Sequence, residues 1–161
     1  MTDPAFRDVR QAYCWWGNDT VYSPYYGTAF VSEFLGADAA SLAMLDNGST
    51  AVAAYVVYST SNIPIRLLVI NTNYFDGTGT RPNTSVTFVG LSTTNGTKQA
   101  KRLTAPSALS RVDQGASVTI GGGSFAADCL KEGTERTESV AVSERAFTVL
   151  VNASEALIVY L

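Results

Sequence analysis

The spacing of hydrophobic positions changes once along the chain, near Gly36. Before that point one segment, "SPYYGTAFVSEFLG" (23–36), carries apolar residues at helical spacing: Tyr26, Ala29, Phe30, Phe34 and Leu35. Ser23 is a candidate N-cap, Pro24 suits the first helical position, and Gly36 suits the end of a helix. The pattern predicts one helix over 23–36 with a large apolar face.

After Gly36 the hydrophobic period becomes two, which is typical of β-strands. Strands are predicted at 41–46, 50–58, 64–72, 84–90, 98–104, 116–125, 136–143, 147–152 and 156–161. The segment 50–58 is apolar on both faces, as in a central strand, whereas 98–104 is polar enough for an edge strand. Turn signals separate the strands by roughly 8 to 12 residues. We therefore expect an all-β fold, an antiparallel β-sandwich of about eight strands preceded by one short α-helix.

Composition narrows the classes of protein to consider. The chain has 161 residues, of which 46% are hydrophobic and 16% charged, so it is a folded domain. The net charge is -3 and the 11 basic residues form no run, which argues against binding nucleic acid. No apolar stretch reaches the roughly 20 residues that span a bilayer. The polar segment 1–11 does not have the apolar centre of a signal peptide.

An excess of sequons nevertheless favours a secreted origin. Five Asn-x-Ser/Thr sequons make possible glycosylation sites of Asn18, Asn47, Asn83, Asn95 and Asn152. The two cysteines, Cys14 and Cys129, either form a disulfide or stay as two buried thiols. Without any histidine in the chain, a zinc site on two cysteines is not expected.

The sequence offers no catalytic constellation. The absence of histidine excludes Ser-His-Asp and Cys-His arrangements. Glycoside hydrolysis needs two convergent carboxylates. Glu33 lies on the predicted helix, and the remaining glutamates are expected in turns or at exposed strand positions: Glu132, Glu135, Glu138, Glu144 and Glu155. We predict no catalytic residue, no cofactor and no metal.

Aromatic residues cluster at the front of the chain. Trp15, Trp16, Tyr25 and Tyr26 could form a flat platform on which a sugar stacks, or could pack against a protein surface. Adjacent tryptophans beside an apolar helix favour packing. A binding module for polysaccharide remains the alternative, because these rings would serve it.

Several stretches carry a family resemblance: the "SPYYGTAFVSEFLG" helix, "TAVAAYVVY", "IRLLVINTNYFDGTGTRP", "KQAKRLTAPSA", the "GGGSF" turn and the terminal "ASEALIVYL". In this order they resemble the C-terminal β-domain of fungal glycoside hydrolase family 79, which comprises β-glucuronidases and heparanase-like enzymes. The resemblance covers roughly residues 20 to 161.

The resemblance implies a catalytic (β/α)8 barrel as the partner of this domain. Residues 1–36 would then be the end of that barrel, including its last helix, and residues 37–161 the β-sandwich. The family's catalytic glutamates lie on earlier barrel strands, so none can be assigned here. The implied role is a non-catalytic, extracellular support for a barrel that this chain does not contain. Another interpretation makes the chain the end of a longer polypeptide whose barrel is encoded upstream.

This interpretation makes a physical prediction about the helix. Without a barrel, its apolar face, formed by Tyr25, Tyr26, Phe30 and Phe34, would be partly exposed. The chain should then either self-associate or fold the helix over its own sheet.

Overall fold

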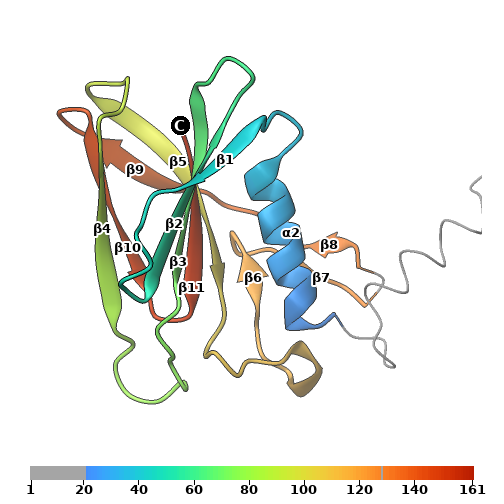
Figure 1. Cartoon of the computed structure of the whole chain (residues 1–161). Helices are drawn as coiled ribbons and strands as arrows, with labels where there is room; N and C mark the ends of the chain where they lie inside the picture. Colours follow the sequence, from blue (N-terminus) through green and yellow to red (C-terminus); the bar gives the residue numbers. More distant parts are fainter. Residues whose placement is uncertain (1–20, 128) are drawn as a thin grey trace, which may run out of the picture.

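The computed structural model describes residues 21–127 and 129–161, and these form three layers (Figure 1). A seven-stranded antiparallel sheet lies in the middle, a two-stranded sheet packs on one face, and a helix packs on the other. The β-sandwich predicted from the strand pattern is therefore confirmed.

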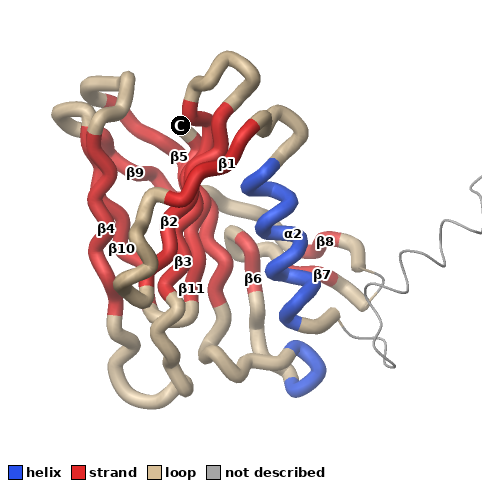
Figure 2. Tube along the Cα trace, in the orientation of Figure 1, coloured by secondary structure: helices blue, strands red, loops and turns tan. Residues whose placement is uncertain are grey.

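The helix α2 spans Ser23–Leu35, and a short 3-10 turn, η1, spans Val112–Gln114. The strands are β1 (Ser41–Met44), β2 (Val52–Tyr58), β3 (Pro64–Asn71), β4 (Asn83–Val89), β5 (Gly96–Thr104), β6 (Thr119–Ile120), β7 (Ser124–Phe125), β8 (Lys131–Glu132), β9 (Glu138–Val142), β10 (Ala146–Asn152) and β11 (Glu155–Tyr160). The main sheet has the order β1-β2-β3-β11-β5-β6, and β9 also pairs with β5. Strand β10 pairs with β4, and β7 with β8 (Figure 2).

Strand β11 shows why the C-terminal segment of the sequence is apolar at nearly every position. It lies between β3 and β5, so both of its faces are covered. Leu157 and Val159 pack against the two-stranded sheet, whereas Ala156 and Ile158 pack under α2. A strand buried on both faces loses the hydrophobic alternation that a half-exposed strand shows.

The two-stranded sheet keeps that alternation. Phe147, Val149 and Val151 of β10 point into the core, and the residues between them face solvent. The ring of Phe88 from β4 lies 5.2 Å from that of Phe147. This layer closes the sandwich on the face opposite α2.

Helix α2 covers the other face of the main sheet. Its residues Tyr26, Phe30 and Phe34 are buried in one cluster with side chains of β3 and β11. Of the two outcomes expected for the apolar helix face, the chain adopts the second, and its own sheet covers that face. The apolar side of the helix is therefore not available to a partner protein.

The ends of α2 confirm one sequence prediction and correct another. Gly36 does terminate the helix, with φ of 56° and its N–H donating to the Ser32 carbonyl at 2.9 Å. Ser23 is not the N-cap: the helix already includes it, Tyr22 takes that position, and no side chain caps the first turn. The Ser23 hydroxyl instead donates to the carbonyl of Ser110 at 3.4 Å.

The prediction that the polar segment 98–104 forms an edge strand was wrong. This segment forms most of β5, which lies between β11 on one side and β6 and β9 on the other. A central strand tolerates Lys101 and Arg102 because each finds carboxylates on neighbouring elements. The predicted strand 116–125 is divided into β6 and β7, whereas β8 had no signal in the sequence, because a two-residue strand is too short to show a period.

Candidate functional site

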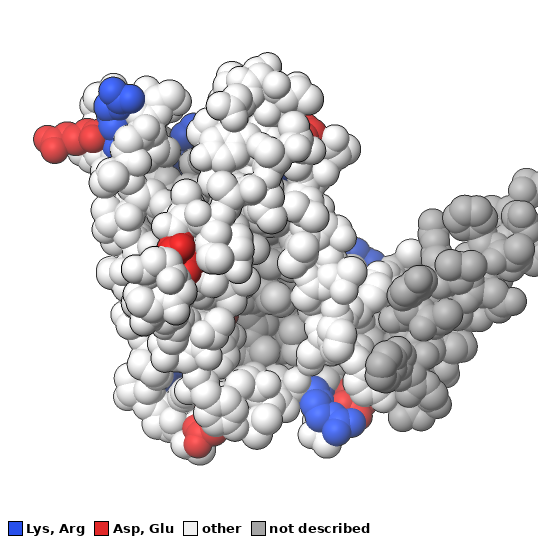
Figure 3. Space-filling view, in the orientation of Figure 1, with Lys and Arg blue, Asp and Glu red and all other residues white. Residues whose placement is uncertain are grey.

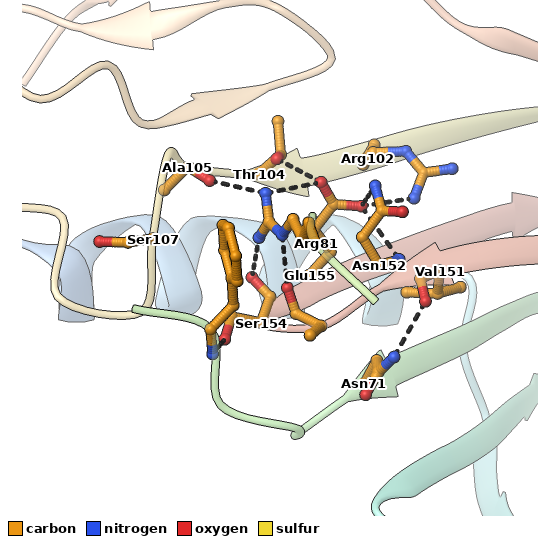
Figure 4. Close-up of polar contacts among 12 residues, drawn as sticks. Asn71, Arg81, Arg102, Thr104, Ala105, Ser107, Val151, Asn152, Ser154 and Glu155 are labelled. Atoms are coloured by element: carbon orange, nitrogen blue, oxygen red, sulfur yellow. Dashed lines mark hydrogen bonds and ion pairs between the residues drawn. The ribbon is translucent and has the colours of Figure 1, made fainter. Parts of the chain in front are cut away.

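A buried carboxylate, Glu155, lies at the start of β11 and gathers polar groups from several segments (Figure 4). It is 6% exposed. Its carboxylate accepts hydrogen bonds from the Thr104 hydroxyl at 2.5 Å, from Arg102 Nη1 at 2.8 Å and from Asn152 Nδ2 at 3.0 Å. The prediction that this glutamate is exposed was wrong, because β11 is central and its first residue faces the interior.

Arg81 completes this network from the long loop before β4. Its Nε donates to the Ala153 carbonyl at 2.7 Å, its Nη1 to Ala105 at 2.9 Å and its Nη2 to Ser154 at 3.1 Å. Nη1 also lies 3.3 Å from Oε1 of Glu155. One guanidinium thus joins three chain segments: its own loop before β4, the loop after β5 and the β10–β11 turn (Figure 4).

The electrostatics of Glu155 keep it ionised. Burial raises the pKa of its carboxyl. The hydrogen bonds from Thr104 and Asn152 and the charge of Arg102 lower that pKa by more than burial raises it, so the net pKa is below the ordinary value of 4.5. A general acid in glycoside hydrolysis has a raised pKa and free access to substrate. Glu155 has neither, and its contacts are those of a structural residue.

A second charged cluster joins α2 to the main sheet. Lys101 Nζ of β5 forms ion pairs with Glu33 of α2 and, at 3.1 Å, with Glu135. The Tyr160 hydroxyl donates to Glu33, and Lys131 pairs with Glu135. Burial, reinforced by the Glu33 carboxylate, raises the pKa of Tyr160 to about 12.

These two clusters engage four of the glutamates in ion pairs. Glu33 and Glu135 share Lys101, while Glu138 and Glu155 share Arg102. A cation thus lies between the two carboxylates of each pair. The described residues also hold no group of His, Cys, Asp and Glu that could bind a metal ion. No helix in this part of the chain is long and apolar enough to cross a membrane.

A cavity of about 360 Å³ opens between the first turns of α2 and the ends of the strands. Its apolar lining includes Tyr26, Ile70, Leu103, Val118 and Ala156. The hydroxyls at its rim are already engaged, because Ser107 and Ser110 bond each other and Ser154 donates to Asn73. Figure 3 shows that the face carrying α2 has few charged side chains and is hollowed near its centre.

The aromatic residues predicted for sugar or protein contact are engaged within the domain where the structure describes them. Tyr26 is 1% exposed, and its hydroxyl accepts the Phe125 N–H at 3.2 Å. The Tyr25 hydroxyl donates to the carbonyl of Cys129 at 3.3 Å. Both rings meet Phe125 edge to face, at 4.9 and 5.1 Å, so both pack within the domain, and the ring of Tyr26 is closed to a sugar by its burial. Trp15 and Trp16 lie outside the described residues.

The described residues include some of the positions predicted for a disulfide and for glycosylation. Cys129 is disulfide-bonded. Its predicted partner, Cys14, lies outside the described residues, so that pairing stays a prediction. The sequon asparagines Asn47, Asn83 and Asn95 are exposed, whereas Asn152 is partly buried and Asn18 lies outside the described residues.

Sequence reasoning missed the residues that organise the interior polar network: Arg81, Arg102 and Glu155. Arg81 stands in a loop of glycine, threonine and proline, where an arginine is usually solvated. The Lys101-Arg102 pair was the available signal, because two cations in a strand with buried neighbours require carboxylate partners.

A strong structural relative is found among the solved structures. The crystal structure of a 4-O-α-L-rhamnosyl-β-D-glucuronidase from Fusarium oxysporum 12S, determined with Rha-GlcA bound, is 43% identical and superimposes with a TM-score of 0.85. The match covers 92% of this chain but 32% of that protein, so the chain spans about a third of its relative. No curated protein matches the chain.

More distant enzymes share only part of the fold. An arabinofuranosidase is 12% identical over 71% of the chain and 20% of its own length, with a TM-score of 0.48. A GH30 endoxylanase from Clostridium papyrosolvens C71 is 12% identical over 87% of the chain and 28% of its own length, with a TM-score of 0.46.

The model of one protein family matches residues 54–158, which is most of the chain. The matched segment runs from β2 through nearly all of β11, and so contains most of the main sheet and the Arg81–Glu155 network. Together with the 43% identity to the Fusarium enzyme, this match shows that the chain belongs to the glycosyl hydrolase family 79 C-terminal beta domain family.

Proposed function

We propose that the chain is a non-catalytic β-domain that packs on and stabilises the catalytic barrel of a β-glucuronidase-like glycoside hydrolase. The observation that carries this proposal is the extent of the match to the Fusarium enzyme. Nearly all of this chain aligns, yet it accounts for only 32% of that enzyme. Glu33 and Glu135 share Lys101, and Glu138 and Glu155 share Arg102, which supports a structural role for these carboxylates.

A surface suited to such a partner remains after α2 has packed on the sheet. On the solvent side of the helix, Val31 is 43% and Leu35 38% exposed. On the edge strand β1, Leu42 and Met44 lie opposite Val57 and Tyr55, and so face the α2 side of the main sheet. Both side chains are 55% exposed. Apolar side chains concentrated on one face are typical of a surface that another protein covers.

The division of the chain is part of the same proposal. Residues 1–36 are the end of the barrel and residues 37–161 the sandwich, so α2 would contact the sandwich through Phe30 and the barrel through its opposite side. A glycoside hydrolase of this family is expected outside the cell, and the sequons support that placement.

The experiment combines the chain with a Fusarium rhamnosyl-glucuronidase that lacks its aligned C-terminal region. We expect the two to co-elute and the truncated enzyme to gain thermal stability. The Val31→Asp variant should weaken this association, while Thr148→Asp, which adds the same charge on β10, should not. Failure of the soluble partners to associate would contradict the proposal.

A direct assay addresses catalysis. The chain alone should not hydrolyse an aryl β-glucuronide. Turnover by the chain alone that a single glutamate substitution abolishes would overturn the assignment.

The alternative, a polysaccharide-binding module, rests on Trp15 and Trp16, since Tyr25 and Tyr26 pack internally. Affinity electrophoresis on uronic-acid polymers addresses it. Retardation of the chain that Trp15→Ala and Trp16→Ala abolish would favour the binding module over the structural domain.

A further inference from the structure

The described sequons differ in what their asparagine amide nitrogen does. In N-glycosylation this atom, Nδ2, becomes bonded to the sugar, so in the folded product it keeps one hydrogen and needs open space toward solvent for the sugar. The four asparagines have the same sequence signature, and only the structure separates them.

The amide nitrogen of Asn152 is already hydrogen-bonded within the domain. Nδ2 donates to Oε2 of Glu155 at 3.0 Å, and the backbone N–H of Asn152 lies 3.3 Å from the same oxygen. The rest of this sequon is engaged as well. Ala153 is fully buried, and the Ser154 hydroxyl accepts from the Phe75 N–H and donates to the Asn73 carbonyl. A sugar on Asn152 would be forced into the network around a buried carboxylate.

Asn47 lies in an exposed turn between β1 and β2. Its side-chain oxygen, Oδ1, accepts from the backbone N–H of Ser49 at 3.0 Å and from the Ser49 hydroxyl at 2.5 Å. Its Nδ2 makes no hydrogen bond with the described residues, so it is left for solvent. Gly48, between them, has φ of 70° and no atom within 4 Å of the position of a Cβ. The turn is therefore open to solvent at Gly48.

Asn95 lies in the connection between β4 and β5, and its side chain is similarly arranged. Oδ1 accepts from the N–H of Glu144 at 3.3 Å, which fixes the amide, and within the described part of the chain Nδ2 has no partner. The β4–β5 and β9–β10 connections lie together at the end of the sandwich away from α2 (Figure 1). A glycan here would leave the proposed barrel-facing surface free.

Asn83 is exposed but belongs to regular sheet. It is the first residue of β4 and lies opposite Asn152 in the strand pairing. The hydroxyl of its neighbour Thr84 accepts from Asn71. Asn47 and Asn95, by contrast, lie in the connections between strands.

We propose that Asn47 and Asn95 carry N-linked glycans in the folded protein and that Asn152 does not. The donor is an oligosaccharide linked through pyrophosphate to a polyprenyl lipid. Transfer forms a bond between Nδ2 and the anomeric carbon, breaks the bond from that carbon to the pyrophosphate, and releases one amide proton together with the lipid pyrophosphate. The second amide hydrogen stays on Nδ2.

The test secretes the full chain from a yeast behind a leader peptide and maps glycopeptides of the folded fraction by mass spectrometry. We expect glycan on the peptides that contain Asn47 and Asn95, and an unmodified Asn152. Asn47→Gln and Asn95→Gln should each remove one glycan and leave the melting temperature of the enzymatically deglycosylated chain unchanged.

Asn152→Gln is the matched control. It should leave the glycan count unchanged and lower the melting temperature, because it alters the contact with Glu155. Peptide mapping of the unsubstituted chain gives an answer even if this variant does not fold. A glycan on Asn152 in the folded fraction, or its absence from either turn, would overturn the assignment of that residue.

Discussion

Lys101 of β5 and Glu33 of α2 form an ion pair across the boundary between the helix and the main sheet. The side chain of Lys101 is 11% exposed, and that of Glu33 is 26% exposed. Tyr160 adds a hydrogen bond to the same carboxylate oxygen. The helix is therefore attached to the sheet by a polar contact as well as by the apolar residues on its buried face, and the two can be separated by substitution.

Replacing Lys101 by methionine should destabilise the domain. The change leaves Glu33 and Glu135 without a shared cation, and we expect a loss of about 1–3 kcal/mol in the free energy of unfolding, because the pair is only partly buried. Urea denaturation measures it. Lys98→Met on the same strand is the control, since Lys98 forms no ion pair with the described residues. Equal losses in the two variants would contradict a specific role for Lys101.

The second prediction concerns acid. The pKa of Glu155 is below 4.5 in the folded chain, because bonds from Thr104 and the charge of Arg102 outweigh the effect of burial. Its contribution to stability is therefore complete above about pH 4.5 and is lost as the pH falls through the lowered folded value. Glu155→Gln should lower stability at neutral pH and flatten the loss in acid.

The measurement for that prediction is the free energy of unfolding as a function of pH, from neutral to about pH 3. Glu144→Gln is the matched control, because Glu144 is exposed and forms no ion pair within the described chain. Parallel pH profiles for the original chain and Glu155→Gln would show that this carboxylate does not carry the effect.

The sequence predicted the layers better than the polar interior. Alternation places Phe147 on the inner face of β10, and the continuous apolar run of β11 follows from burial on both faces. The site of Glu155 could not be predicted, because its partners Arg81 and Thr104 are distant in sequence and a charged residue is usually solvated. Local patterns report which face a residue takes, whereas ion pairs between distant segments depend on topology.

The C-terminal end of α2 supports a third prediction. Gly36 has φ of 56° and ψ of -179°, a backbone conformation that essentially only glycine adopts. A Cβ there would lie 2.8 Å from both the guanidinium of Arg66 and the carboxylate of Asp38. That guanidinium donates to the Leu35 carbonyl at 3.3 Å. Gly36→Ala should therefore cost about 1–3 kcal/mol.

Gly27→Ala is the counterpart within the same helix. No atom lies within 4 Å of the position of its Cβ, so the methyl group is accommodated without a clash. Alanine is favoured over glycine in a helix, and we expect a gain of about 0.5–1 kcal/mol. Thermal denaturation of both variants gives the comparison. A loss in Gly27→Ala as large as that in Gly36→Ala would contradict this account of the helix end.

The last prediction concerns the exposed edge of β4. Among the described residues this strand pairs only with β10, in a continuous register without a bulge, from Asn83 opposite Asn152 to Val89 opposite Ala146. Its sequence, NTSVTFV, contains no charge and no proline. Charges, prolines and bulges usually keep an edge strand from pairing with another chain, and β4 has none of them. Without a partner covering that edge, the isolated chain should self-associate through it at high concentration.

Thr87→Lys should reduce that association, because a charged side chain on the edge opposes strand pairing. Thr148→Lys is the control: its hydroxyl lies 2.8 Å from that of Thr87, so it adds the same charge to the same face but on β10, the strand with which β4 pairs. Sedimentation of the three proteins over a range of concentrations measures the effect. The edge is the site of association if only Thr87→Lys shifts the equilibrium toward monomer. If the two lysine variants shift it equally, general charge repulsion is responsible, and the apolar surface on α2 and β1 becomes the place to look.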